Sequence, residues 1–198
     1  MTPLLVATTN PGKLREIRHV LGELSLQLRT LADYPGVAEP AESGATFAEN
    51  ARLKALSYAA ATGELTVAED SGLVIDALNG EPGVQSARYL GEHASYPERF
   101  AHIFARLDAL GARDSAARFV CALTLVRGGR VLFEAEGRVE GRVAPEPRGT
   151  NGFGYDPIFF YPPYGGTLAE VDNDRKLAVA HRGVAFRKLR DFLKNHAV

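Results

Sequence analysis

The sequence has 198 residues, a length that suits one domain with a full hydrophobic core. Lysine and arginine number 23 against 24 aspartate and glutamate residues, giving a formal net charge of −1. This near balance leaves no broad positive field to hold DNA or RNA. No apolar run reaches the roughly 18 residues of a membrane span, and the N-terminus lacks the pattern of a signal peptide. The single cysteine, Cys121, lies in an apolar run and suits a reducing compartment. We therefore expect a cytoplasmic protein with a small-molecule partner and with neither nucleic acid nor a membrane.

A short apolar strand over residues 4–7 is predicted to lead directly into a helix. Asn10 is a favourable N-cap, and Pro11 suits the first helical position. A helix start presents free backbone N–H groups and the positive end of the helix dipole, which favours anions. Lys13 opposes that dipole, so a bound phosphate would resolve the conflict; a plain capped helix with a solvated lysine is the alternative. The candidate phosphate-binding turn consists of Thr8, Thr9, Asn10, Pro11, Gly12 and Lys13.

A second helix and a strand bring in the acidic residues. Residues 46–49 read Thr-Phe-Ala-Glu, a capping box that predicts a helix to about residue 62, with Lys54 on one face. A strand over residues 65–68 then runs into Glu69-Asp70-Ser71-Gly72. Adjacent carboxylates at a strand end can hold Mg²⁺ or activate water. A plain turn over residues 70–72 is the alternative, because Asp, Ser and Gly are common in turns.

The middle of the chain predicts a third helix and a β-hairpin. Residues 95–98 form another capping box ahead of an apolar helical face that ends near Gly111. Two apolar strands over residues 118–126 and 131–141 flank Gly128-Gly129, a turn typical of a hairpin. A last helix is predicted from about Gly183. Together these elements predict an α/β fold with a mixed sheet, in one domain over residues 1–198.

A glycine-rich loop and a basic segment complete the candidate site. In Gly152-Phe153-Gly154-Tyr155-Asp156, the glycines would let a planar base approach Phe153, and Asp156 could accept a hydrogen bond from a ring N–H. The loop precedes an apolar strand rather than a helix, so it is not a dinucleotide-binding fingerprint. Further along, Lys176, His181 and Arg182 offer donors just before the last helix; a surface pair at a helix start is the alternative for the last two.

Five motifs resemble those of the inosine/xanthosine triphosphate pyrophosphatase family. They occur in the family's order and are spread over nearly the whole chain. Two positions depart from the common pattern: Glu69 stands where many relatives carry Asp, and Ala180 where Ser is common. The motifs are residues 7–13, residues 42–55 with Glu42 and Phe47-Ala48-Glu49-Asn50, residues 69–73, residues 152–157 and residues 180–183.

The resemblance implies a two-lobed fold around a long mixed sheet, a homodimer, and hydrolysis of a triphosphate to monophosphate and pyrophosphate with Mg²⁺. Residues 8–13 and Lys54 would hold phosphates, and Asp70 would be proton acceptor and metal ligand. Glu42 would be the second metal ligand, with Glu39 as the alternative. The nucleoside site would comprise Ser71, Phe153, Gly154, Tyr155, Asp156, Lys176, His181 and Arg182.

The expected substrates are non-canonical purine nucleotides such as ITP, dITP and XTP, which carry a 6-oxo acceptor and an N1–H donor. Donors from His181 or Arg182 at O6 and an acceptor from Asp156 at N1–H would leave unpaired groups against adenine, a mismatch that can discriminate by about 10⁴. Guanine shares both groups, and the sequence does not show how it is excluded. A related pyrophosphatase for other modified nucleotides and a nucleotide-sensing binding module are the alternatives.

Overall fold

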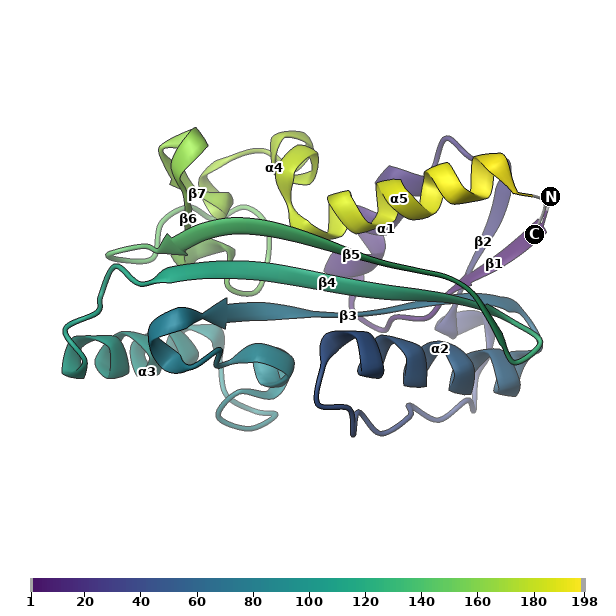
Figure 1. The fold of residues 1–198 in the computed structure, drawn as a ribbon, viewed down its shortest axis with the longest axis horizontal. Coiled ribbons are helices and arrows are strands. Elements are labelled where there is room, and N and C mark those ends of the chain that lie inside the picture. The colour runs from purple at the N-terminus through teal and green to yellow at the C-terminus, as the bar shows by residue number, and fades with distance from the viewer. Residues whose placement is uncertain (1, 197–198) are drawn as a thin grey trace. The chain divides into compact units, whose positions relative to one another are not determined.

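The computed structural model describes residues 2–196. Its strands form one seven-stranded sheet with the order β2-β1-β3-β4-β5-β6-β7. Strand β1 pairs in parallel with β2 and β3, whereas β6 pairs antiparallel with β5 and β7. The predicted α/β class with a mixed sheet is therefore confirmed (Figure 1). The strands are β1 (Thr2–Val6), β2 (Leu26–Thr30), β3 (Leu65–Ile75), β4 (Ala116–Arg127), β5 (Arg130–Val143), β6 (Phe159–Tyr161) and β7 (Gly166–Thr167). The helices are α1 (Pro11–Leu21), α2 (Phe47–Thr62), α3 (Tyr96–Ala109), α4 (Asn173–Val179) and α5 (His181–Asn195).

The residues group into two compact units. Unit 1 comprises residues 1–70, 121–137 and 181–198, and unit 2 comprises residues 71–120 and 138–180. Strands β3, β4 and β5 each contribute one segment to either unit. Among residues 2–196, every helix is too short or too polar to span a lipid bilayer.

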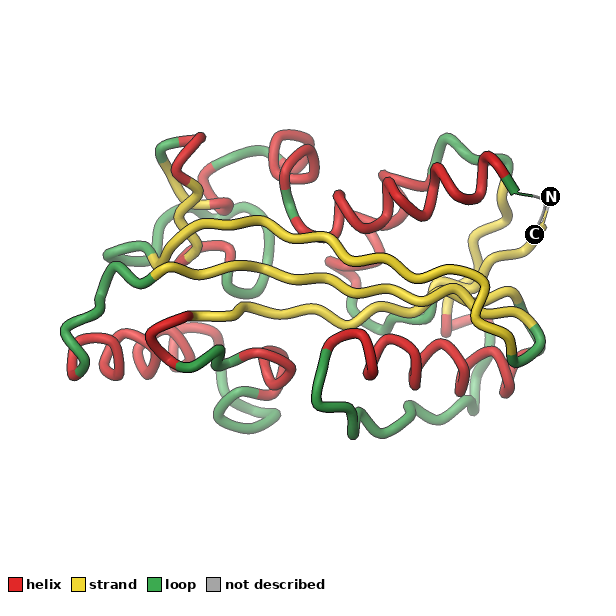
Figure 2. The backbone as a smooth tube through the Cα atoms, viewed as in Figure 1, coloured by secondary structure: helices red, strands yellow, loops and turns green. Residues whose placement is uncertain are grey.

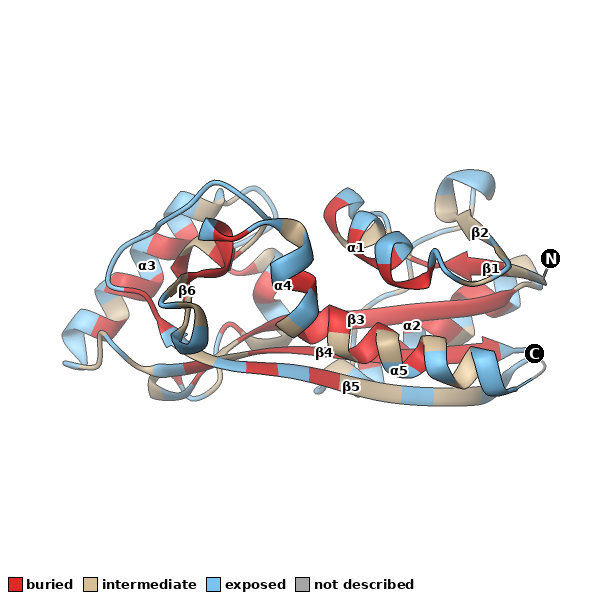
Figure 3. Cartoon of the chain, turned by 90° about the horizontal axis from the view of Figure 1, so that it is seen from above, coloured by how far each residue is buried: buried red, intermediate tan, exposed pale blue. Residues whose placement is uncertain are grey.

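In unit 1, helices cover both faces of the sheet. Helices α1 and α5 pack on one face, and α2 lies on the other (Figures 1 and 2). The first face buries Ile17 of α1 and Phe186 of α5 against strand residues such as Leu123. The second buries Ala55 and Tyr58 of α2. With both faces covered, the unit 1 part of β3 is buried along its length (Figure 3).

Unit 2 has its own hydrophobic core. Helix α3 contributes Phe100, Ile103 and Leu107, which pack with aromatic residues that include Tyr155 and Phe159. The glycine-rich loop therefore ends inside this core, because Tyr155 is only 3% exposed. Helix α4, which has only seven residues, follows in the same unit.

Most local predictions are confirmed. Asn10 caps α1 with Pro11 in its first turn, the capping boxes at Thr46 and Ser95 begin α2 and α3, and β4 and β5 flank the glycine turn. The short strand over residues 65–68 was too short a prediction: β3 continues to Ile75. The alternative of a plain turn over residues 70–72 is therefore wrong. Sequence patterns also missed β2, β7 and α4, and α5 begins two residues before the predicted start.

Gly137 is a position in unit 1 where β5 and α5 come too close for a side chain. A Cβ there would overlap the carbonyl oxygen of His181 and lie 2.5 Å from the backbone nitrogen of Ala185. Both atoms belong to the first turns of α5, so they cannot move aside as a flexible side chain would. The first turn of α5 therefore owes its position against the sheet to this glycine.

We expect Gly137→Ala to lower the free energy of unfolding by about 1–3 kcal/mol, the usual cost of overpacking. Urea denaturation of the variant and the wild type measures the difference. Arg130→Ala, at an exposed position of the same strand, is the control and should change stability by no more than about 0.5 kcal/mol. An unchanged midpoint for Gly137→Ala would contradict the close packing of β5 on α5.

Candidate active site

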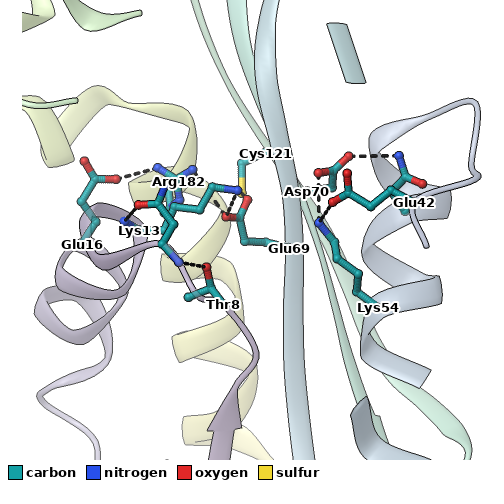
Figure 4. A network of polar contacts seen from close by, with 11 residues as sticks. Thr8, Lys13, Glu16, Glu42, Lys54, Glu69, Asp70, Cys121 and Arg182 are labelled. Carbon is teal, nitrogen blue, oxygen red and sulfur yellow. Dashed lines mark hydrogen bonds and ion pairs between the residues drawn. The ribbon is translucent and has the colours of Figure 1, made fainter. Parts of the chain in front are cut away.

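Two consecutive acidic residues of β3 define the centre of the candidate site in unit 1. Side chains alternate along a strand, so Glu69 and Asp70 point to opposite sides of it (Figure 4). Both are buried, at 4% and 5% exposure. Buried carboxylates need ionic or hydrogen-bonding partners, and each has its own set.

On the α2 side, Asp70 is held by two side chains of that helix. The Lys54 ammonium lies 3.0 Å from Asp70 Oδ1, and Asn50 Nδ2 donates to Asp70 Oδ2 at 3.2 Å. Lys54 also donates to Glu42 Oε1 at 2.7 Å, so one ammonium joins the two predicted metal ligands. The spacing of residues 50 and 54, one helical turn apart, places both side chains over β3.

The electrostatics of this cluster suit a proton acceptor. Burial raises the pKa of Asp70 above its usual range, although Lys54 acts in the opposite direction. Burial also disfavours the charge of Lys54, but Asp70 and Glu69 outweigh it and raise the pKa of the ammonium. Asp70 is thus a more basic carboxylate than an exposed aspartate, held by a lysine that stays protonated.

The segment before α2 is fixed by the same helix. The side-chain oxygen of Asn50 accepts a hydrogen bond from the backbone of Gly44 at 2.8 Å, and Glu49 Oε2 accepts from Ala45 at 2.7 Å. A Cβ at position 44 would lie 2.7 Å from Asn50 Oδ1, so only glycine fits. These contacts place Glu42, two residues earlier, beside Lys54. Glu39, by contrast, is exposed.

The oxygen atoms of Glu42 and Asp70 fit a hard divalent cation. Both carboxylates already approach one positive charge, the Lys54 ammonium, within 3.0 Å. Mg²⁺ favours one or two carboxylates together with water and substrate phosphates. Within residues 2–196, no group of three or more His, Cys, Asp or Glu side chains is arranged to hold a metal. A cation here would therefore depend on substrate oxygens and water for its remaining ligands.

On the other side of β3, Glu69 contacts the candidate phosphate-binding turn. Lys13 Nζ lies 2.8 Å from Glu69 Oε1, and Arg182 Nη2 lies 3.5 Å from the same oxygen. Arg182 Nη1 also donates to Glu16 Oε2 at 2.7 Å. Burial opposes the charge on Glu69, but Lys13, Arg182 and Lys54 together hold its pKa far below the usual range.

The turn itself is built as predicted. Asn10 Oδ1 accepts from the Lys13 backbone N–H at 3.1 Å, and Thr8 Oγ1 accepts from the Asn10 N–H at 3.2 Å. Thr9, Asn10 and Pro11 are exposed, whereas Gly12 is buried. The helix start is therefore accessible to a ligand, with the Lys13 ammonium directed to β3.

In unit 2, the glycine-rich loop and Lys176 form a second cluster. Asp156 Oδ2 accepts from the Phe153 backbone N–H at 2.8 Å and from Lys176 Nζ at 2.6 Å. The Lys176 ammonium also lies 4.6 Å from the centre of the Phe153 ring, a cation–π contact. Phe153 is half-buried, while Asp156 and Lys176 are almost fully buried.

Tyr155 has a structural position within the same loop. Its ring packs edge-on against Tyr96 at 5.3 Å, and its hydroxyl donates to the Ser86 carbonyl oxygen at 2.9 Å. The Ser86 hydroxyl in turn accepts from the Leu73 N–H at 2.9 Å, two residues after Ser71. The side chain of Tyr155 therefore ties the loop to the segment beside β3.

The predicted site residues fall into two sets, one in each unit. Glu16 and Asn50 were not assigned to the site from the sequence, although Asn50 lies within one of its motifs. Glu16 lies one helical turn after Gly12 and one before Val20, within the buried face of α1, and a charged residue at that spacing was the available signal. Glu69 was named as a candidate carboxylate, but its ion pairs with Lys13 and Arg182 were not predicted. Unit 1 holds Thr8, Thr9, Asn10, Pro11, Gly12, Lys13, Glu42, Lys54, Asp70, His181 and Arg182; unit 2 holds Ser71, Phe153, Gly154, Tyr155, Asp156 and Lys176.

Known proteins resemble this chain over nearly its full length. The Ham1 family matches residues 4–192. A protein of Geobacter sulfurreducens named dITP/XTP pyrophosphatase is 46% identical over 193 residues, which are 98% of this chain and 97% of the relative. One of the same name from an Exiguobacterium species is 45% identical over 94% of each chain.

Solved structures agree with these relatives. A HAM1 protein from Coxiella burnetii superimposes with a TM-score of 0.92 at 39% identity, over 99% of this chain and 100% of that one. A protein from Mycobacterium abscessus named nucleoside-triphosphatase / dITP/XTP pyrophosphatase has a TM-score of 0.76 at 42% identity, over 97% of this chain and 99% of that one. The chain belongs to the Ham1 family.

The buried ion pair in unit 2 gives a test of how the loop is held. Lys176→Met would leave the Asp156 carboxylate buried without its ammonium, so we expect a loss of about 3–5 kcal/mol in unfolding free energy. The double variant Lys176→Met/Asp156→Asn should recover part of that loss, because Asn keeps an acceptor for the Phe153 N–H without the charge. Urea unfolding of the wild type, the single variant and the double variant measures both the loss of unfolding free energy and its partial recovery. If the double variant is no more stable than Lys176→Met, the uncompensated charge is not the cause.

Proposed function

We propose that this protein hydrolyses non-canonical purine nucleoside triphosphates, such as ITP, dITP and XTP, to the monophosphate and pyrophosphate. The observation that carries the proposal is the pair of clusters on the two opposite sides of β3: Asp70 with Lys54 and Glu42, and Glu69 with the Lys13 turn. Relatives of 45% and 46% identity that are named dITP/XTP pyrophosphatases support the same reaction. The activity would remove damaged nucleotides before polymerases incorporate them.

In this proposal, each residue has a role that its environment favours. Lys13, with the positive end of the α1 dipole, and Lys54 would hold the phosphate chain. Asp70, whose pKa is raised by burial, would accept the proton of the attacking water. Asn50 would orient the Asp70 carboxylate through its hydrogen bond. Glu42 and Asp70 would hold Mg²⁺. A bound Mg²⁺ supplies charge stabilisation for the phosphate oxygens.

The base would be read by the cluster in unit 2. Phe153 offers a half-buried ring for stacking, with the Lys176 ammonium beside it as a donor for a 6-oxo group. Asp156 would accept a hydrogen bond from N1–H. In unit 1, His181 stays a predicted donor to the nucleoside, whereas Arg182 would first stabilise Glu16 and Glu69, because its side chain is 2% exposed.

We further propose that the two units act as one catalytic domain, that the protein is a homodimer, and that it works in the cytoplasm. The family resemblance supports the dimer, and sedimentation equilibrium of the pure protein tests it. A cytoplasmic nucleotide pool is where the substrates of such an enzyme occur.

The reaction and its selectivity are tested together. With Mg²⁺, the protein should release pyrophosphate from ITP and XTP and should be inactive in EDTA. The catalytic efficiency for ATP should be about 10⁴-fold lower, because adenine reverses the donor and acceptor at positions 6 and 1. A panel that includes GTP and methylated or oxidised nucleotides separates this function from a related pyrophosphatase. Orthophosphate as the first product would contradict it, and binding without turnover would indicate a sensor.

Asp70→Asn tests the proton acceptor. The amide keeps the size of the side chain and an oxygen for Asn50 or Lys54, but it cannot take a proton. We expect kcat to fall by about 10²–10⁴, while the affinity for ITP, measured by calorimetry in the absence of metal, changes little. Glu92→Gln, at an exposed carboxylate with no role in the candidate site, is the control and should keep full activity. Substantial turnover by Asp70→Asn would exclude Asp70 as the base.

A further inference from the structure

The Glu69 carboxylate lies in a buried ionic cluster, and the proposed reaction assigns no role to it. Its carboxylate receives Lys13 Nζ at 2.8 Å and Arg182 Nη2 at 3.5 Å, and the Cys121 thiol lies 3.4 Å from its other oxygen. The Glu69 side chain is 2% exposed. These contacts join β3 to the starts of α1 and α5 within unit 1.

Lys13 is the most accessible member of this cluster. Its side chain is 20% exposed, against 2% for Glu69 and Arg182. Lys13 lies in the first turn of α1, where its charge opposes the helix dipole. Glu69 thus supplies in the free protein the negative charge that the helix start and the lysine would share with a phosphate.

Glu69 already pairs with Lys13 before any ligand binds: the Lys13 ammonium lies 2.8 Å from Glu69 Oε1, and Arg182 Nη2 lies 3.5 Å from the same oxygen. An incoming phosphate must therefore compete with Glu69 for the Lys13 ammonium. At an effective dielectric constant of about 20, the attraction between Lys13 and Glu69 at 2.8 Å is worth more than a tenfold change in affinity, and the phosphate must compete with it.

We propose that Glu69 is a positioning residue that acts as the counter-ion of the phosphate site when no phosphate is bound. This inference rests on the proposed function. Glu69 holds the Lys13 ammonium beside β3 in the free protein, and it weakens the binding of the phosphate chain and of pyrophosphate. Binding exchanges one anionic partner of Lys13 for another, while Arg182 and the Cys121 thiol stay with Glu69. Release of pyrophosphate is favoured because the ion pair between Glu69 and Lys13 forms again.

The test measures binding of inorganic pyrophosphate in EDTA by calorimetry, so that neither turnover nor metal contributes. Glu69→Gln keeps the shape of the side chain and removes its charge. We expect it to bind pyrophosphate at least about tenfold more tightly than the wild type. Damage to the structure would weaken binding, so the sign of the change separates the two explanations.

A double-mutant cycle with Lys13→Met shows whether the gain passes through the lysine. The tighter binding of Glu69→Gln should vanish in the Lys13→Met background. Glu16→Gln is the matched control, because Glu16 is another buried carboxylate bound to Arg182; its gain should be smaller than that of Glu69→Gln. An equal gain with and without Lys13 would overturn the proposal, since it would reflect only the removal of a charge.

Further outcomes separate this inference from the proposed function. If the wild type binds pyrophosphate and hydrolyses ITP but Glu69→Gln binds no more tightly, the counter-ion role alone is wrong. If the wild type binds no pyrophosphate at all, the phosphate site and the counter-ion role are both wrong. Should Glu69→Gln not fold, Glu69→Asp replaces it in the test, and the sign of the change in pyrophosphate affinity again decides. The shorter side chain withdraws the carboxylate from Lys13 by one methylene. We therefore expect Glu69→Asp to bind pyrophosphate more tightly than the wild type, but by less than the about tenfold expected of Glu69→Gln.

Discussion

The alternation of side chains along β3 is the constraint on which the candidate site depends. Because successive residues face opposite ways, one peptide unit delivers two carboxylates into two different environments. Asp70 meets an ammonium and an amide from α2, and Glu69 meets cations from α1 and α5. Neither carboxylate could be buried without those partners, so the helices that cover the sheet also determine its chemistry.

This arrangement separates two tasks that a single carboxylate could not perform. The proposed base, Asp70, has its pKa raised by burial, which its lysine only partly offsets. A permanent counter-ion needs a low pKa, and Glu69 obtains it from several cations. The difference lies in the number of positive neighbours, not in the residue type.

Sequence patterns predicted the parts of the fold that local rules decide. Asn10 and Thr46 cap helices because their side chains reach backbone N–H groups three residues later, and Gly128-Gly129 turns a hairpin. The end of β3 could not be predicted in this way, because Asp70-Ser71-Gly72 has turn composition. Tertiary packing overrides it: a Cβ at position 72 would lie 2.5 Å from the Gly83 carbonyl oxygen, so the glycine serves close packing, not a turn. The candidate residues were found through their motifs, but the ionic partners of Arg182 lie 166 and 113 positions away in sequence and only the fold reveals them.

The position of Cys121 has a practical consequence for following this protein in solution. Its thiol is fully buried, and burial together with the neighbouring Glu69 raises its pKa well above the usual range. A protonated, enclosed thiol does not react with alkylating reagents, since the thiolate is the nucleophile. Alkylation can proceed only when the sheet opens at the strand that carries the thiol. The sole cysteine of the chain is thus an intrinsic reporter of local opening beside the ionic cluster, and its labelling rate measures how firmly that cluster closes the core.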